Sequence, residues 1–460
     1  MSESELHAYE RLGGSQARAC APRVGVVLAA GRSERLSRLT RGDSKALLRI
    51  GGVSLVERAV RGLVRVGLER VIVVVGYRAG VVAALIDHLG LDFVQTAFAE
   101  GWEAGNGASL AAAEPYVEGE ATFLLVTADH VFGRGSLEEL ARSDGPAALI
   151  DHAPEPDVWD EGTRVRLRGD VVTGFSKGFD GPAIDCGAFV LPLSVFDAQR
   201  RAMQAGDASL AGAISTLAAT SAIRAVPLDG RSWCVDVDTP ADARRAQTAL
   251  RRSLGRPSDG PISRLVNRPI STRLSMAISP LRPHPDLLSL VALVLGLGAG
   301  WALSGGNAIV GALLAMATSI LDGVDGESAR LQQRDGPSGA LLDGVLDRVT
   351  DASMVAGLAV WAFHQGHGSI AVILLAVGAT SVSLLSMATK DRIKALSLPS
   401  APERAIAYML GGRDGRLLLV SLAALAEVPY LGLWAIVVTG GLSLLARLVS
   451  IRGMTPSTLV

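Results

Sequence analysis

Hydrophobic positions divide the chain into two halves with different patterns. Between residues 23 and 250, short apolar runs at 24–28, 71–75 and 123–126 are separated by segments of helical periodicity, one of which starts at Ser54. Beyond residue 285, much longer apolar segments follow one another with few charges inside them. Alternating strand and helix predicts a doubly wound, Rossmann-like α/β domain. The long apolar segments predict an all-α membrane domain.

Six membrane helices are expected in the carboxy-terminal half. Their approximate spans are 286–304, 307–322, 340–363, 369–388, 416–428 and 431–450. Several are shorter than the ~20 residues that an upright crossing needs, and the fifth is the shortest of all. Because these lengths leave the helix boundaries open, we predict the orientation of the domain from the distribution of its charged residues.

Positive charge alternates between the connections of these helices. Lysines and arginines gather before the first helix, between the second and third, between the fourth and fifth, and after the sixth. The connections around residues 304–307, 364–368 and 427–431 contain neither residue type. Because cytoplasmic loops carry the excess of positive charge, we expect both termini on the cytoplasmic side of a multi-pass plasma membrane protein.

Composition shifts define the remaining boundaries. Residues 1–22 are rich in Glu, Arg, Gly and Ser and lack an apolar core, which excludes a signal peptide and predicts a disordered tail. Residues 23–250 form the α/β domain, and residues 285–455 form the membrane domain. Between them, in residues 251–284, apolar positions from 262 to 278 alternate with arginines. This pattern predicts a basic amphipathic helix on the membrane surface, with a plain linker as the alternative.

Overall composition narrows the class of protein. The net charge of −1 gives no electrostatic reason to expect a nucleic-acid partner. The mean hydropathy of +0.35 is high for a soluble protein, and the excess lies beyond residue 285. Cys20, Cys186 and Cys234 are scattered, so they predict neither a disulfide framework nor a metal cluster and suit a cytoplasmic compartment.

Four aspartates flank the connection between the second and third membrane helices. On a helix, Asp322 and Asp325 share one face, and Asp343 and Asp347 share another, which continues to Asp351. Stacked carboxylates repel, and each ionised side chain at membrane depth costs ~2.5–3.5 kcal/mol. A divalent cation removes both penalties, because carboxylates are ligands for Mg²⁺ and Mn²⁺. A solvated acidic loop is the alternative, which the placement of these acids on the helices disfavours.

The residues around this cluster form the pattern D-x2-D-G-x2-A-R-x8-G-x3-D-x3-D, from Asp322 to Asp347. This pattern resembles the signature of the CDP-alcohol phosphatidyltransferases. The resemblance implies that the four aspartates bind a pair of divalent metals and that the other signature residues bind the CDP-activated substrate, namely Gly326, Ala329, Arg330 and Gly339. Gly326 would let backbone approach a phosphate, Arg330 would add a charged fork, and Asp347 could accept a proton from an attacking hydroxyl.

A small-residue loop follows the first predicted strand of the α/β domain. It comprises Leu28, Ala29, Ala30 and Gly31, and Arg35 and Lys45 follow it. Backbone N–H groups of such a loop can cradle phosphates, and the two cations add positive charge. Neither the dinucleotide pattern G-x-G-x-x-G nor a P-loop is present in the sequence.

A wider constellation extends this loop. The motif L-A-A-G-x-x-x-R is followed by Ser44-Lys45-Ala-Leu-Leu and by Gly51-Gly52-x-x-Leu55-x-x-Arg58. It is similar to the MobA-like nucleotidyltransferases that join a sugar phosphate to a nucleoside triphosphate, although that family usually has proline where this chain has Ser44. The resemblance implies roles for the residues that match the family's site. The loop, Arg35 and Lys45 would hold the triphosphate. Asp129 and Asp236 would bind Mg²⁺, with Asp238 as the alternative to Asp236. The base would be recognised by Gly105, Asn106 and Gly107, and the sugar phosphate would be contacted by Lys177 and Asp185.

The two modules in this order resemble a bifunctional family that joins an inositol-1-phosphate cytidylyltransferase to a di-myo-inositol phosphate phosphate synthase. The resemblance implies that CTP and inositol 1-phosphate give CDP-inositol, whose inositol phosphate group moves to a second inositol 1-phosphate. It also implies Mg²⁺ at both sites, with Mn²⁺ as a substitute, and a homodimer through the membrane domain. The phosphate of the acceptor requires nearby cations, for which Lys390 and Arg392 are candidates beside Lys394.

Two alternatives remain. One is a phospholipid enzyme that takes CDP-diacylglycerol, with the α/β half as another cytidylyltransferase or a nucleotide sensor. The other is a transporter with a regulatory domain, which a cluster of acids at the cytoplasmic surface disfavours, because transport sites lie near the midplane.

Overall fold

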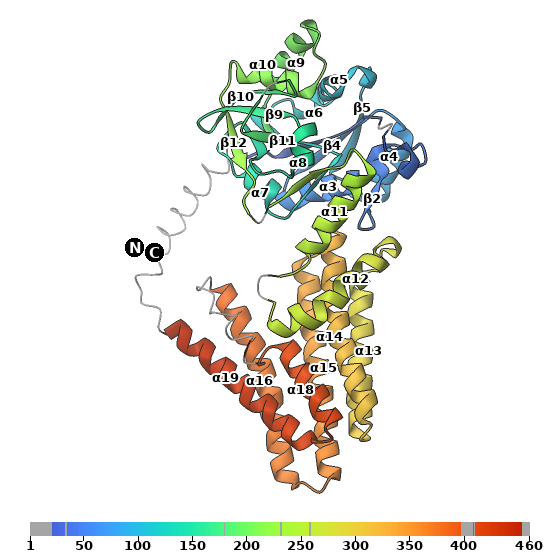
Figure 1. Cartoon of the computed structure of the whole chain (residues 1–460), viewed down its shortest axis with the longest axis vertical. Coiled ribbons are helices and arrows are strands. Elements are labelled where there is room, and N and C mark those ends of the chain that lie inside the picture. The colour runs from blue at the N-terminus through green and yellow to red at the C-terminus, as the bar shows by residue number, and fades with distance from the viewer. Residues whose placement is uncertain are drawn as a thin grey trace. The chain divides into compact units, whose positions relative to one another are not determined.

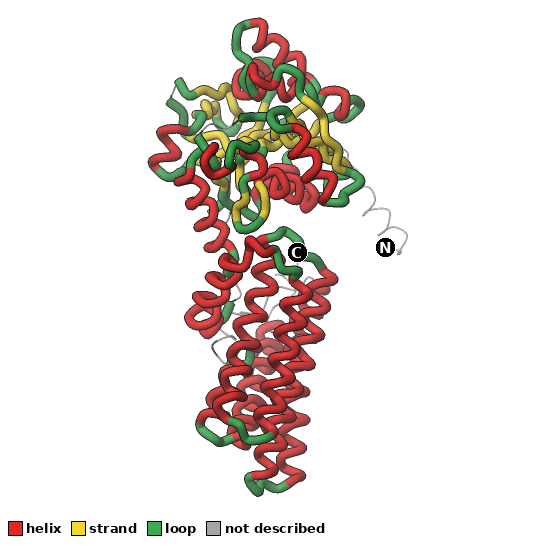
Figure 2. The backbone as a smooth tube through the Cα atoms, turned by 90° about the vertical axis from the view of Figure 1, so that its right-hand side faces the viewer, coloured by secondary structure: helices red, strands yellow, loops and turns green. Residues whose placement is uncertain are grey.

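The computed structural model describes residues 21–452 except 33–34, 179, 231, 257–258, 397–407 and 409. The chain divides into two compact units, Met1–Leu250 and Arg251–Val460 (Figure 1). In the described part of the chain, strands occur only in the first unit (Figure 2). The expected disordered tail, residues 1–22, lies outside the described residues apart from Ala21 and Pro22.

The first unit is built on a nine-stranded mixed sheet with the order β5-β4-β1-β6-β11-β8-β12-β10-β9. Its strands are β1 Val24–Ala29, β4 Arg70–Val75, β5 Val94–Phe98, β6 Thr122–Thr127, β8 Ala147–Asp151, β9 Arg164–Arg168, β10 Val171–Ser176, β11 Ala183–Pro192 and β12 Ile223–Pro227. The strands β5, β4, β1 and β6 are parallel, whereas β11 runs antiparallel to β6 and β8. The predicted α/β class is confirmed.

Helices cover both faces of this sheet. They are α2 Ser37–Thr40, α3 Leu55–Val66, α4 Ala79–His88, α5 Asn106–Ala111, α6 Glu114–Val117, α7 Ser136–Ala141, α8 Pro156–Glu161, α9 Ser194–Gln204, α10 Leu210–Ala218 and α11 Pro240–Ser253. Side chains of a strand alternate between its faces. Accordingly Val24, Val26 and Leu28 of β1 join one buried cluster, while Val27 and Ala29 join the other.

Two local features position the polar residues of this unit. Since β1 and β6 are parallel, the loops that follow them, with Gly31 and Asp129, leave the sheet at the same edge. A separate two-stranded ribbon pairs β7 (His130–Phe132) with β13 (Cys234–Asp236). In this ribbon Asp236 is directly opposite His130, which brings a residue from the end of the unit to the edge where Asp129 lies.

The second unit is a helical bundle. Its long helices are α13 Pro285–Ser304, α14 Ala308–Leu331, α15 Pro337–His364, α16 Ser369–Ala395, α18 Arg413–Leu425 and α19 Pro429–Arg452 (Figure 1). Among the described residues, four helices are long and apolar enough to cross a membrane, namely α13, α14, α16 and α19. The other two differ because α15 carries several charges and α18 has only 13 residues.

The second expected membrane segment, 307–322, lies within a longer helix, because α14 continues to Leu331. The last turns of this helix are polar. Inside the bundle these polar groups have partners: Ser289 Oγ donates to Asp325 Oδ2 at 2.6 Å, and Ser271 and Ser275 each donate to Glu327 at 2.7 Å. The first half of the acidic signature, Asp322–Arg330, thus stands on a continuous helix.

Helical structure also covers most of the segment expected to be amphipathic. A π-helical turn, Ser263–Asn267, leads into α12, Arg268–Ile278. Ser271 and Ser275 are buried against α14, whereas Leu265 and Ile270 are exposed. The polar side of this helix therefore faces the bundle and its apolar side faces outward, as expected of a helix that contacts lipid.

Candidate active sites

The first candidate site is a cavity of about 330 Å³ at the carboxyl ends of β1 and β6. Its lining is formed by Leu28, Ala29, Gly31, Arg32, Arg35, Lys45, Ala46, Asn106, Thr127, Ala128, Asp129 and Asp238. The structure therefore brings together most of the predicted phosphate loop, both predicted cations and the first predicted metal ligand. Arg32, which the sequence did not single out, also lines this cavity.

Lys45 is buried among three carboxylates. Its Nζ atom lies 3.1 Å from Asp129 Oδ2 and 3.8 Å from Asp236 Oδ1, and it donates a hydrogen bond to Asp238 Oδ1. Burial alone would lower the pKa of Lys45, but these three charges outweigh burial and raise it, so the ammonium group stays charged. Arg35 Nη2 lies 2.8 Å from Asp238 Oδ2. Asp238 therefore contacts both predicted phosphate-binding cations, one through each carboxylate oxygen.

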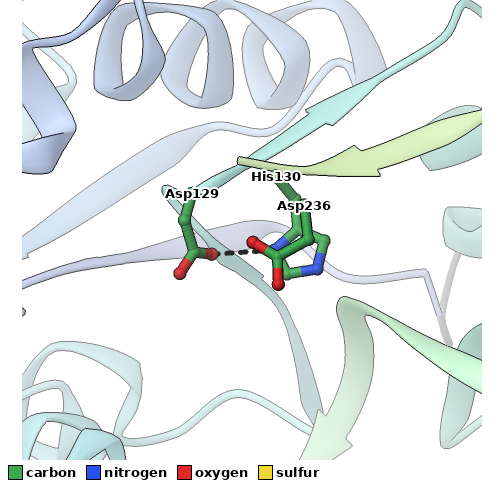
Figure 3. A group of neighbouring side chains, drawn as sticks. All are labelled: Asp129, His130 and Asp236. Atoms are coloured by element: carbon green, nitrogen blue, oxygen red, sulfur yellow. Dashed lines mark hydrogen bonds and ion pairs between the residues drawn. The ribbon is translucent and has the colours of Figure 1, made fainter. Parts of the chain in front are cut away.

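Asp129, His130 and Asp236 form a compact group beside the cavity, with potential ligand atoms within 4.8 Å of one another (Figure 3). The His130 Nδ1 atom lies 2.7 Å from Asp129 Oδ1. Burial lowers the pKa of His130, but Asp236 and Asp129 raise it to about 10. Burial raises the pKa of Asp236 to about 6. Asp129 and Asp236 thus stabilise the protonated form of His130.

The sequence did not assign a role to His130. The available signal was its position directly after Asp129, but its approach to Asp236 depends on the pairing of β7 with β13, which single-chain patterns do not reveal. The same ribbon separates the two competing acids: Asp236 faces His130, whereas Asp238 faces Lys45 and Arg35. This geometry favours Asp236 over Asp238 as the partner of Asp129 at a cation.

Only part of the predicted base-recognition loop lines the cavity. Asn106 is in the cavity lining, whereas Gly105 and Gly107 pack against neighbouring backbone. Gly105 has a φ of +139°, and a Cβ at Gly105 or Gly107 would lie 2.7 or 2.5 Å from the Ala208 carbonyl oxygen. Glycine is needed at both positions because the loop packs tightly on this backbone.

The remaining predicted residues of this unit lie outside the cavity lining. Ala30 is buried beside it, and Lys177 is exposed. Asp185 Oδ1 accepts a hydrogen bond from the Gly187 backbone at 2.8 Å, and burial raises the pKa of Asp185 to about 6.

The second candidate site is a cavity of about 330 Å³ in the helical unit. The carboxylate oxygens of Asp322, Asp325 and Asp343 lie within 4.8 Å of one another at this cavity. Cationic side chains surround the acids, and those that line the cavity are Arg256, Arg268, Arg330, Arg348, Lys390, Arg413 and Arg447. A group of three carboxylates suits a hard divalent cation, and the surrounding cations suit phosphate groups.

Asp347 lines the same cavity but is not one of the three acids whose oxygens all lie within 4.8 Å of one another. Arg413 bridges it to the group: Arg413 Nη1 lies 2.5 Å from Asp322 Oδ1, and Nη2 lies 2.8 Å from Asp347 Oδ1. The sequence missed Arg413, because it stood among several cations assigned only to the cytoplasmic charge pattern. Its position at the first residue of α18, opposite the aspartate helices, is a tertiary property.

Asp351 continues the row of Asp343 and Asp347 by one further turn, but it serves packing. Its Oδ2 atom lies 2.8 Å from Arg416 Nη2 and 3.3 Å from Arg348 Nη1, and it accepts a hydrogen bond from Ser383 at 2.7 Å. The side chain of Asp351 is buried. This ion network ties α15 to α16 and α18.

The other predicted residues of the signature divide into two groups. Gly326 and Arg330 line the cavity, as does Lys390, one of the candidates for the acceptor phosphate. Ala329, Gly339 and Arg392 are not part of the cavity lining, and Gly339 and Arg392 are exposed. The side chain of Lys394 lies outside the described residues.

Comparison with known proteins finds a family model for each of the two units. Residues 25–168 match the family model of the MobA-like NTP transferase domain, and residues 282–445 match the CDP-alcohol phosphatidyltransferase model. The Bifunctional IPC transferase and DIPP synthase of Rubrobacter xylanophilus is 35% identical over 435 residues, which cover 93% of this chain and 96% of the relative. The chain belongs to this bifunctional family. A second member, from Thermococcus kodakarensis, is 31% identical over 88% of this chain and 91% of its own length.

This family membership makes the chain a transferase with a nucleotidyltransferase and a CDP-alcohol phosphotransferase domain. Acidic groups in both domains fit the divalent metals that such enzymes generally use. Among solved structures, the inositol-1-phosphate CTP transferase from T. maritima covers 50% of this chain and 96% of its own, with 24% identity and a TM-score of 0.45.

Proposed function

We propose that the first unit makes CDP-inositol and diphosphate from CTP and 1L-myo-inositol 1-phosphate. The second unit then transfers the inositol phosphate group of CDP-inositol to a second inositol 1-phosphate and releases CMP. One observation carries the proposal: each unit has its own cavity in which a carboxylate group faces phosphate-binding cations. The names of the relatives, which pair an IPC transferase with a DIPP synthase, support the order of the two steps.

In the first unit, the loop 28–31 with Arg35 and Lys45 holds the triphosphate of CTP, and Asn106 contacts the base. A phosphate oxygen of inositol 1-phosphate attacks the α-phosphorus, and the bond to the β-phosphate breaks to release diphosphate. Lys45 is suited to this role because its charge is maintained beside Asp129 and Asp238. Asp185 and Lys177 are the proposed contacts of the inositol phosphate.

Mg²⁺, with Mn²⁺ as a substitute, is the proposed cation of both sites. Asp129 and Asp236 would hold it in the first unit, and Asp322, Asp325, Asp343 and Asp347 would hold it in the second. Their hard oxygen atoms at close range fit such a cation. When bound, it supplies charge neutralisation for the diphosphate and the leaving CMP.

In the second unit, Gly326, Ala329, Arg330 and Gly339 are proposed to bind the CDP portion. A hydroxyl of the acceptor attacks the phosphorus that carries inositol, the bond to the CMP oxygen breaks, and Asp347 accepts the hydroxyl proton. Its place in the cavity wall, one turn beyond Asp343 on α15, supports this general-base role. Lys390, which lines the cavity, and Arg392 are proposed to attract the acceptor phosphate.

The membrane domain, residues 285–455, is proposed to cross the plasma membrane six times, with α15 and α18 completing the four apolar helices. The pairing of charged side chains on α15 and α18 supports six crossings, because Asp351 and Arg416 are buried against each other. Both sites and both termini face the cytoplasm in this proposal, residues 251–284 form the linker and surface helix, and two chains associate through the membrane domain.

A product assay tests the proposal. The purified full chain is incubated with CTP, Mg²⁺ and a panel of alcohol phosphates, and every cytidine-containing product is identified by mass spectrometry. CDP-inositol followed by CMP is the expected result. Separate assays with CDP-inositol and CDP-diacylglycerol as donors examine the second site. Use of CDP-diacylglycerol alone would replace the proposal with a role in phospholipid synthesis.

A further inference from the structure

The segment that follows α11 contributes to the wall of the membrane-unit cavity. Arg256 and Asp259 line this cavity together with Gly326 and Arg330 of the signature helix. Arg330 Nη2 also donates to the Leu254 carbonyl oxygen at 3.0 Å. The linker is therefore part of the catalytic unit, although no pattern in the sequence placed it there.

Two guanidinium groups converge beside Gly326. A Cβ at this position would lie 3.2 Å from Arg330 Nη1 and 3.3 Å from Arg256 Nη2. Among the residues that the structure describes, Arg256 forms no ion pair through its side chain, and it is exposed. Two like charges held together at a cavity wall repel each other, and a dianionic group between them would remove that repulsion.

Ionic contacts fix the position of Arg256 relative to α14. The Arg256 backbone N–H donates to Asp259 Oδ2 at 2.8 Å. The same carboxylate accepts two hydrogen bonds from Arg268, at 2.8 and 3.0 Å. Arg268 Nη1 in turn lies 2.5 Å from the fully buried Glu327, one residue after Gly326. Burial raises the pKa of Asp259, but the hydrogen bonds from Arg268 outweigh burial and lower it, so this carboxylate is charged at neutral pH.

We propose that Arg256 binds the diphosphate of the CDP-activated donor in the membrane-unit site, opposite Arg330, and that Asp259, Arg268 and Glu327 are positioning residues for it. The inference rests on the proposed function in taking a nucleotide diphosphate as the donor, and it adds a ligand from outside the signature. A bidentate guanidinium contact to a diphosphate needs a held backbone, which these three residues supply.

Donor kinetics test the proposal on the full chain. Arg256→Ala should raise KM for the CDP-alcohol about 10- to 100-fold, the effect of losing a hydrogen bond to a charged group. KM for the acceptor and the CTP-dependent reaction of the first unit should stay unchanged. Arg256→Lys should restore part of the affinity. The matched control is Arg252→Ala, an exposed arginine four residues earlier that lies outside the cavity lining.

A double-variant measurement of donor KM tests the role of the positioning residue Asp259. Asp259→Asn should also raise donor KM, and the double variant with Arg256→Ala should show less than the product of the two effects, since both act on one contact. Donor KM equal in Arg256→Ala and Arg252→Ala would overturn the proposal, and so would independent effects in the double variant. All assays use CDP-inositol and CDP-diacylglycerol in parallel. A wild-type preference for the latter would revise the proposed function, while the effect of Arg256 on the shared diphosphate would still decide this inference.

Discussion

At the scale of single residues, Lys45 concentrates the positive charge of the first site. It is buried beside Asp129 and Asp238. We expect Lys45→Ala to reduce formation of the CDP-alcohol from CTP by about 10²–10³-fold. This is the usual effect of removing one fixed donor that stabilises charge in a transition state. Use of supplied CDP-inositol should be spared.

Diphosphate release and CMP release measure these two reactions separately. Arg200→Ala is the matched control, because Arg200 is an exposed residue paired with Glu114 and Asp197 and lies outside the cavity lining. Equal loss of both reactions in Lys45→Ala would contradict two independent sites.

Asp343 and Asp347 lie one turn apart on α15, but their surroundings differ. Asp343 belongs to the group of three acids, whereas Asp347 contacts Arg413. Asp343→Asn should weaken metal-dependent donor binding. Asp347→Asn should retain donor binding, because Asp322, Asp325 and Asp343 still hold the metal, and should reduce transfer by about 10²–10⁴-fold, as expected for loss of a general base. Calorimetry in detergent with and without Mg²⁺ measures the binding, and CMP release measures the transfer. Weak donor binding in Asp347→Asn would instead mean that Asp347 acts chiefly as a metal ligand.

At the scale of elements, the short helix α18 is held in the bundle by ion pairs. It has 13 residues, and its first turns place Arg413 and Arg416 against Asp351 of α15. Breaking a buried ion pair by removing one partner typically costs ~3–5 kcal/mol, because the other charge stays buried. We therefore expect Asp351→Ala to lower the thermal unfolding midpoint in detergent.

Asp286→Ala is the control for this stability measurement. Asp286 is half exposed and lies 3.6 Å from His284 near the start of α13. A surface substitution of this kind changes stability by less than about 0.5 kcal/mol. Equal midpoints for the two variants would show that the network around Asp351 does not stabilise α18.

The helices and strands also show which features a sequence can supply. Apolar runs located β1, β4 and β6 and the long helices, because burial of side chains determines these elements locally. The apolar run 307–322 covers only part of α14, since the polar end of this helix is stabilised by Ser289, Ser271 and Ser275 from other helices. Asp129 and Lys45 could be chosen from a motif. His130, Arg413 and Arg256 could not, because only the fold brings them to the acids or the signature helix.

At the scale of the whole molecule, two catalytic units on one chain make the overall reaction divisible. A Lys45→Ala chain still has an intact second site, and an Asp347→Asn chain still has an intact first site. We expect a mixture of the two purified variants to form the final product from CTP, while neither forms it alone. The rate should be lower than that of the wild type, because tethering raises the local concentration of the intermediate.

Time courses of CDP-inositol and CMP follow this exchange. Free CDP-inositol should accumulate before CMP in the mixture, since it must leave one chain and reach another. A mixture that makes CDP-inositol but no final product would mean that the second site accepts only an intermediate made on its own chain.

The uninterrupted course of α14 has a consequence for how the enzyme can fit different bilayers. From Ala308 to Leu331 a single helix joins the apolar span to Asp322, Asp325 and Arg330. Each added or lost residue turns a helix by about 100° and shifts it by about 1.5 Å. A change of length before Asp322 would therefore rotate both acids away from Asp343. The end of α14 that carries Asp322 and Asp325 must therefore keep its position relative to Asp343. Adaptation to a thicker or thinner membrane must occur at the other end of the helix, beside Asn307.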